Sequence, residues 1–167
     1  YEKRFMLAEP EIFKIFTFPF LQGDPQTALD NPHSLILTET TARKYFGQQN
    51  PIGKIISANG KFDFKITGIF KDIPKNSHLQ FDFIIPFIFG RELNYTVDIW
   101  QNSQFNTYVQ LQSGILVEDV ITKISNYLDD KPNLEENVKL TLQPLTRIHL
   151  YSNYEYDRQT GDIRYVR

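Results

Sequence analysis

The chain has 167 residues, of which 41% are hydrophobic and 23% charged, and this composition predicts a globular protein of one domain or two small subdomains. A net charge of −2 excludes a nucleic-acid-binding protein that relies on a strongly basic surface. The absence of cysteine excludes thiol catalysis, disulfide bonds and cysteine-ligated zinc.

The first 33 residues predict a strand followed by a short helical turn. The turn begins at Pro10, because the first helical position does not need the N–H that proline lacks. Ile12, Phe13 and Phe16 would share one face of this turn and pack against another element. The following stretch, GDPQTALDNP, is rich in Gly, Asp, Asn and Pro and predicts a loop.

Residues 34–54 predict a strand, a helix and a turn into the next strand. The apolar SLILT forms the strand, and Thr38 is the natural N-cap of the helix ETTARKYF. Gly47 then ends the helix in the left-handed conformation. The sequence PIGK, Pro51 to Lys54, forms the turn, with φ fixed at proline and positive at glycine. These residues have a complete structural explanation, and we assign none of them a functional role.

The next segment predicts a β-hairpin and a further apolar strand. Asn59-Gly60 lies between two strand patterns and is a strong signal of a hairpin turn. Four residues after this turn alternate with polar ones: Phe62, Phe64, Ile66 and Gly68. After Pro74 the chain enters an apolar run, residues 83–89, which is either a core strand or an aromatic surface for a partner. The core strand is the favoured interpretation, and Trp100 is expected to fill a core as well.

The last third predicts a strand–helix–strand arrangement. FNTYVQLQ, residues 105–112, and VKLTLQP, residues 138–144, alternate apolar and polar side chains as strands do. Between them, residues 116–130 place five apolar side chains on one helical face: Val117, Val120, Ile121, Ile124 and Leu128. This order is typical of a split or direct βαβ unit whose helix covers one face of a sheet.

No pattern in the sequence points to catalysis or metal binding. His33, His78 and His149 lie far apart, and none has a carboxylate at ligand spacing. The sequence contains no glycine-rich phosphate loop and no nucleophile elbow. We therefore predict no catalytic, cofactor-binding or metal-binding residues and no cofactor. A small hydrolase, with His78 and neighbouring carboxylates in one pocket, stays open as a hypothesis.

Several short motifs follow one another in the chain. They are Thr38-Glu39, Ala42 with Phe46-Gly47, Asn50 to Lys54, Thr67 to Ile69, and Pro74 with Asn76, Ser77 and His78. PEIFKIFTFPFLQGDPQTAL upstream, with TYVQLQ and LTRIHLYS downstream, extends the series over nearly the whole chain. This series resembles the extracytoplasmic (periplasmic) core domain of MacB/FtsX-like ABC transporter permeases, with the Bacteroidetes-type branch closest.

The resemblance implies an α+β fold with a porter-like βαβ subdomain and an inserted, mainly β, sabre-like subdomain. Residues 1–33 and 101–152 would form the porter-like part, residues 34–100 the inserted subdomain, and residues 153–167 the connector to the second membrane helix. Family members carry a further strand and helix before the position that matches Tyr1. The porter-like sheet would therefore be incomplete in this chain, or completed by another copy or by other residues.

The resemblance also implies transmission rather than catalysis. The chain would be the periplasmic part of an inner membrane permease and would couple cytoplasmic ATP hydrolysis to conformational change. Its partners would be the cytoplasmic ABC ATPase, acting through the membrane part, a second permease copy, and a periplasmic protein or exported substrate. ATPase activity would belong to a separate domain or subunit, so the chain itself would be no enzyme. The alternative is a stand-alone secreted α+β binding module for a peptide or glycan.

Overall fold

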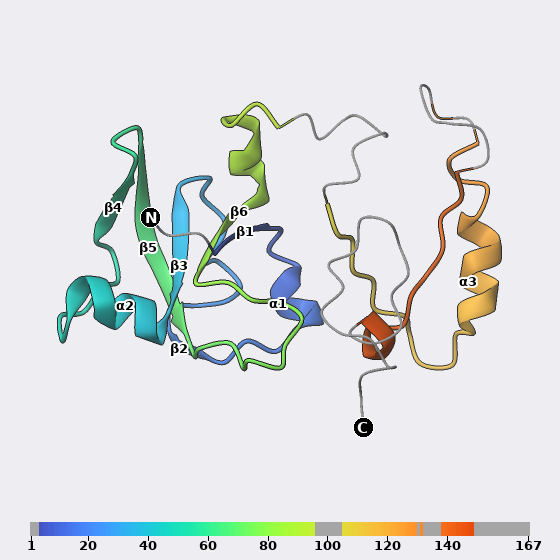
Figure 1. The fold of residues 1–167 in the computed structure, drawn as a ribbon, viewed down its shortest axis with the longest axis horizontal. Helices are drawn as coiled ribbons and strands as arrows, with labels where there is room; N and C mark the ends of the chain where they lie inside the picture. Colours follow the sequence, from blue (N-terminus) through green and yellow to red (C-terminus); the bar gives the residue numbers. More distant parts are fainter. Residues whose placement is uncertain (1–3, 96–104, 130, 132–137, 149–167) are drawn as a thin grey trace, which may run out of the picture. The chain divides into compact units, whose positions relative to one another are not determined.

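The computed structural model describes residues 4–95, 105–129, 131 and 138–148, and the chain forms two compact units, residues 1–97 and residues 98–167 (Figure 1). The first unit contains β1 (Phe5–Ala8), α1 (Ile12–Ile15), β2 (Phe20–Gln22), β3 (Ser34–Thr38), α2 (Glu39–Phe46), β4 (Ile55–Ala58), β5 (Phe62–Phe70), β6 (Phe83–Pro86) and the 3-10 helix η1 (Phe87–Arg91). The second unit contains α3 (Val117–Ile124) and the 3-10 helix η2 (Leu145–Arg147). A mixed sheet with a few helices confirms the α+β fold class.

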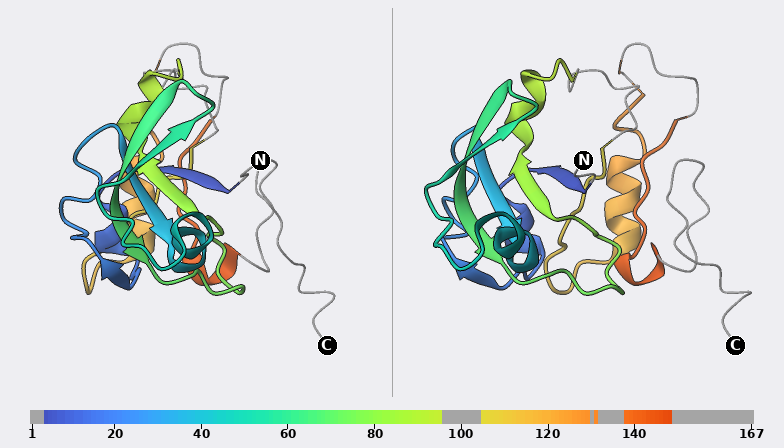
Figure 2. Two further views of the ribbon diagram at one scale, coloured as in Figure 1. Left: turned by 90° about the vertical axis from the view of Figure 1, so that its left-hand side faces the viewer. Right: turned by 60° about the vertical axis from the view of Figure 1, so that its left-hand side comes forward.

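A six-stranded mixed sheet organises the first unit, in the order β1-β6-β3-β5-β2 with β4 paired to β5 (Figures 1 and 2). The β1–β6 and β3–β5 pairs are parallel, whereas β2 and β4 run antiparallel to β5. Strands β1 and β2, from the first 33 residues, therefore share a sheet with strands of residues 34–86. The assignment of residues 1–33 and 101–152 to one porter-like subdomain stays a prediction.

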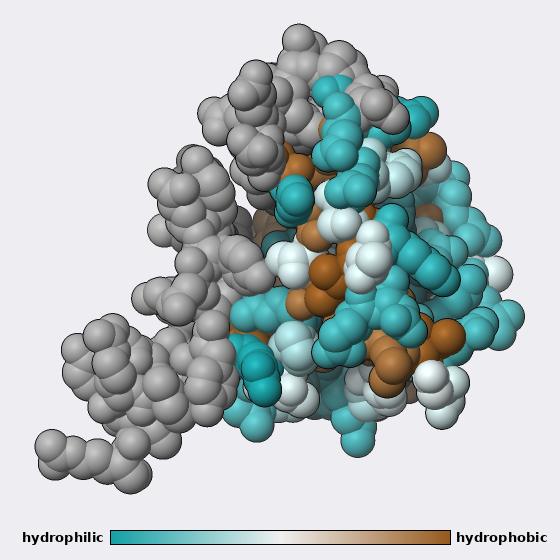
Figure 3. Space-filling model, turned by 90° about the vertical axis from the view of Figure 1, so that its right-hand side faces the viewer, coloured by the Kyte–Doolittle hydropathy of each residue, from teal (hydrophilic) through white to brown (hydrophobic). Residues whose placement is uncertain are grey.

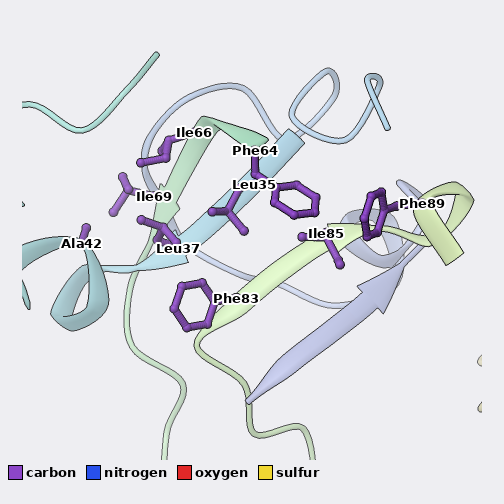
Figure 4. Packing of buried hydrophobic residues seen from close by; sticks show 9 residues of the cluster. All are labelled: Leu35, Leu37, Ala42, Phe64, Ile66, Ile69, Phe83, Ile85 and Phe89. Carbon is purple, nitrogen blue, oxygen red and sulfur yellow. The ribbon is translucent and has the colours of Figure 1, made fainter. Parts of the chain in front are cut away.

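Two hydrophobic clusters lie on opposite faces of this sheet. The first joins β3, β5 and β6 to α2 and η1 (Figure 4), through Leu35, Leu37, Ala42, Phe64, Ile66, Ile69, Phe83, Ile85 and Phe89. The second contains Ala8, Ala28, Leu29, Ile36, Phe70, Phe81 and Ile84. Ile12 and Phe13 of α1 pack against the second cluster, as their spacing predicts, while the ring of Phe16 lies beside that of Phe18.

A bulge in β5 allows this one strand to supply both clusters. Leu35 of β3 pairs with Ile66, but the next residue, Ile36, pairs with Gly68, so Thr67 is the extra residue. Beyond the bulge, each residue of β5 faces the side of the sheet opposite to the one that uninterrupted alternation would give it. Ile66 and Ile69 therefore both enter the first cluster, and Phe70 enters the second.

The second unit contains the predicted helix but not the predicted strands. α3 is shorter than expected, and Val117, Val120, Ile121 and Ile124 are half-buried along it. Residues 105–112 and 138–144 are not strands, so the prediction of two strands is wrong for these described residues. Their alternation is a property of sequence, whereas a strand also needs a hydrogen-bonded neighbour. Trp100, His149 and the predicted connector lie outside the described residues.

The described residues of the second unit have little core of their own. Leu128 is the only buried hydrophobic side chain among them. Several apolar side chains are exposed instead: Val109, Ile115, Leu116, Val138, Leu140 and Leu145. Figure 3 shows one face of the molecule, on which hydrophobic and hydrophilic side chains are interspersed. No helix within the described part of the chain is long and apolar enough to cross a membrane.

Candidate functional site

Helix α2 begins at two side-chain caps. The hydroxyl oxygen of Thr38 accepts a hydrogen bond from the N–H of Thr41 at 3.3 Å, which confirms the predicted N-cap. The carboxylate of Asp72 accepts from the N–H of Thr40 at 3.0 Å and from its hydroxyl at 2.5 Å. A carboxylate suits this position, because the N–H groups at a helix start are unpaired within the helix and carry partial positive charge.

The segment after α2 is a chain of tight turns. Gly47 donates its N–H to the carbonyl of Arg43 at 2.8 Å and has φ 60° and ψ −120°. Its φ is positive as predicted. Its ψ of −120° lies outside the left-handed helical region, so the prediction of a left-handed conformation at Gly47 is wrong. The Asn50 side chain accepts from the N–H of Ile52 at 3.1 Å, and Gly53 has φ 81° in the turn that follows. These bonds fix the loop between α2 and β4.

A hollow of about 300 Å³, the first hollow, lies where this loop approaches β2. It is lined by Leu21, Gln22, Glu39, Ala42, Arg43, Gly47, Gln48, Gln49, Asn50, Pro51 and Ile69. Glu39 and Arg43 form an ion pair at 2.9 Å, one helical turn apart. The lining combines four carboxamide side chains with apolar ones, so the hollow offers hydrogen-bonding groups with little net charge.

A larger hollow of about 660 Å³, the second hollow, lies by α1 and η1. It is lined by Glu9, Pro10, Glu11, Leu29, Asp30, Pro86, Phe87, Ile88 and Arg91. Three carboxylates and one guanidinium stand around apolar side chains, and Ile88 is 51% exposed. This volume lies in the range of small-molecule sites, but neither hollow gathers a nucleophile and a base.

The two described histidines make different contacts. His33 Nε2 is 3.0 Å from Glu92 Oε1, and Nδ1 is 3.2 Å from the carbonyl oxygen of Asp63. His33 thereby links the start of β3 to β5 and to the end of η1. His78 lies beside the ring of Phe16, with 5.9 Å between centroids, and burial lowers its pKa from the ordinary value of 6.5. Neither histidine lines a hollow.

The apolar run of residues 83–89 is largely core, as the favoured interpretation predicts. Phe83, Ile84 and Ile85 are buried in β6, and Phe89 is buried in η1. No group of histidine, aspartate and glutamate side chains within the described residues has the arrangement of a metal site. The prediction that the chain holds no catalytic, cofactor-binding or metal-binding residues stays a prediction.

Two contacts of this region were missed by sequence reasoning. Asp72 caps α2 through Thr40, which lies 32 positions earlier, and Glu92 reaches His33 across 59 positions. The helix-capping and ion-pairing signals that a sequence carries are local, so neither pair had a signal at its own spacing.

A family model described as the MacB-like periplasmic core domain matches residues 3–127. No curated protein sequence matches the chain. Among solved structures, a domain of a predicted permease protein from Porphyromonas gingivalis has a TM-score of 0.62 and 23% identity, with 86% of this chain covered. The periplasmic region of MacB from Actinobacillus actinomycetemcomitans has a TM-score of 0.50 and 14% identity, with 75% covered. This chain spans 67% of the first of these structures and 55% of the second.

Proposed function

This chain belongs to the family of MacB-like periplasmic core domains of ABC transporter permeases, and from that membership we propose that it acts as a mechanical coupling domain. ATP hydrolysis takes place on a separate cytoplasmic domain or subunit. The chain follows the movement of the membrane helices and engages an exported substrate or a partner protein outside the inner membrane. The observation that carries this proposal is the family match over residues 3–127.

The packing of the first unit supports a mechanical role. Its sheet is covered by apolar clusters on both faces, and close-packed interiors resist compression and transmit strain. The caps at Thr38 and Asp72 join α2 firmly to the ends of β3 and β5. A displacement applied to one edge of this sheet would therefore move the unit as a body.

The proposed partners are the cytoplasmic ATPase, a second permease copy, and a periplasmic protein or exported substrate. Movement of the chain would be a shift between two arrangements of the two copies, biased by nucleotide on the other side of the membrane. The first and second hollows are the candidate contact positions in the first unit, since each combines apolar side chains with hydrogen-bonding or charged groups. The porter-like and sabre-like division of the chain belongs to the same proposal.

The proposed location can be tested with single cysteines, because the chain has none of its own and any cysteine elsewhere in the full-length permease can be replaced. Lys75 is exposed, so Lys75→Cys in the full-length permease should react with a maleimide that cannot cross the inner membrane. Ile36 is 0% exposed, and Ile36→Cys is the matched control that should stay unlabelled in the folded protein. Labelling of Lys75→Cys only after the inner membrane is opened would contradict a periplasmic location.

The gene around this chain gives a second, independent test. The proposal expects an apolar run of about 20 residues on each side, enough for a membrane helix. A signal peptide upstream and a stop codon directly after Arg167 would favour the stand-alone binding module instead.

A further inference from the structure

The tip of the β4–β5 hairpin carries the only Asn-Gly pair in the sequence, Asn59-Gly60. Asparagine before glycine is the pair most prone to spontaneous deamidation, because glycine has no side chain to hinder attack by its own backbone nitrogen. We propose that Asn59 is a spontaneous deamidation site of the folded chain. The modification would convert a neutral amide at the hairpin tip into a carboxylate.

The surroundings of the pair leave room for the reaction. Asn59 and Gly60 are both exposed. A Cβ atom placed on Gly60 would meet no atom within 4 Å in the described part of the chain. Water therefore reaches both residues, and the space beside Gly60 is open.

The reaction needs no partner other than water. The backbone nitrogen of Gly60 attacks Cγ of Asn59, and the new N–Cγ bond closes a five-membered succinimide. The C–N bond of the side-chain amide breaks, and ammonia leaves with the proton that the Gly60 nitrogen gives up. Water then opens the succinimide at one of its two carbonyls, which produces aspartate or isoaspartate.

The turn limits how fast this can happen. Asn59 and Gly60 have φ values of 53° and 66°, and the N–H of Lys61 donates to the carbonyl of Ala58 at 3.0 Å. Ring closure requires the backbone to leave this geometry, so the end of the hairpin must open first. β4 has four residues and lies at an edge of the sheet, paired with β5, so local opening does not require unfolding of the unit.

The product would disturb the hairpin that produced it. Isoaspartate adds one methylene group to the backbone, which is incompatible with the pairing of Ala58 with Phe62 across a tight turn. Phe62 packs against the first cluster, so loss of register would weaken that contact. Deamidation at Asn59 would thus destabilise the β4–β5 hairpin and its contact with the first cluster.

Peptide mapping by mass spectrometry tests the proposal. The full chain is incubated at mildly alkaline pH, folded and in denaturant, and each asparagine is followed for a rise of about 1 Da. We expect Asn59 to be the first asparagine converted in the folded chain, with isoaspartate among the products. Its rate should be lower than in the denatured chain, and Asn59→Ser should abolish the early mass change.

Two results would overturn the proposal. One is conversion of a different asparagine before Asn59 in the folded chain. The other is an unmodified Asn59 in the folded chain after the denatured chain has been converted there.

Discussion

The carboxylate of Asp72, just beyond β5, accepts two hydrogen bonds from Thr40, one from its N–H at 3.0 Å and one from its hydroxyl at 2.5 Å. Thr40 lies in the first turn of α2, so Asp72, which is distant in sequence, supplies a second side-chain cap in addition to that of Thr38. The contact ties the start of α2 to the far end of β5. It is one of the bonds that make the first unit a single body.

Asp72→Ala should therefore destabilise the chain by about 1 kcal/mol, the usual effect of losing a helix cap. Asp72→Asn should cost less, because its oxygen still accepts from the N–H of Thr40. Chemical denaturation of the three proteins measures the free energies of unfolding. Equal stability of Asp72→Ala and the unmodified chain would show that the cap contributes nothing.

A comparison of two glycines with positive φ distinguishes the cost of backbone strain from the cost of steric crowding. Gly23 has φ 87°, and a Cβ there would lie 2.3 Å from the carbonyl oxygen of Thr67. Gly53 has φ 81°, but a Cβ there would meet no atom within 4 Å in the described residues. Gly53→Ala should cost roughly 1 kcal/mol from strain alone, and Gly23→Ala roughly 2–4 kcal/mol because the backbone of β5 must also move.

Thermal or chemical unfolding of the two glycine variants checks this difference. Gly53→Ala serves as the matched control for strain. If Gly23→Ala proved no less stable than Gly53→Ala, the close approach of Gly23 to β5 would be wrong.

Local signals predicted much of the first unit correctly. The cap at Thr38 and the turn at Asn59-Gly60 each depend on a few neighbouring residues, and both are present. The bulge at Thr67 was not predicted, because the alternation from Phe62 to Gly68 continues through it without interruption. Only the pairing with β3 shows that Phe70 faces away from Ile66.

Long-range contacts account for what the sequence did not reveal about the candidate site. The first hollow needs β2 beside the loop after α2, and nothing in either segment indicates that they meet. The second unit shows the converse error, since residues 105–112 have a strand pattern without a strand. Pattern indicates which face of a segment is apolar, whereas hydrogen-bonded pairing depends on the rest of the fold.

His78 should make stability depend on pH. Burial lowers its pKa below 6.5, so under mildly acidic conditions the unfolded chain binds a proton that the folded chain does not. The free energy of unfolding should therefore fall as the pH drops below about 6.5, and level off below the lowered pKa of the folded state. At pH 8 the histidine is neutral in both states and has no such effect.

His78→Gln removes this titration and keeps a polar side chain. The variant should lose less stability than the unmodified chain between pH 7.5 and pH 5, whatever its stability at pH 8, with the pH window set by the ordinary histidine pKa of about 6.5. Denaturation curves at several pH values measure both slopes. Identical slopes would exclude His78 as the source of the pH dependence.

Distances between spin labels would show whether this chain moves when nucleotide binds on the far side of the membrane. Lys75→Cys in the full-length permease, with its other cysteines replaced, places one label on each copy at an exposed position. Pulsed electron–electron double resonance then compares the label-to-label distances without nucleotide and with ATP bound. A movement coupled to nucleotide predicts two different distance distributions. The same distribution in both states, or no dipolar coupling at all, would contradict it.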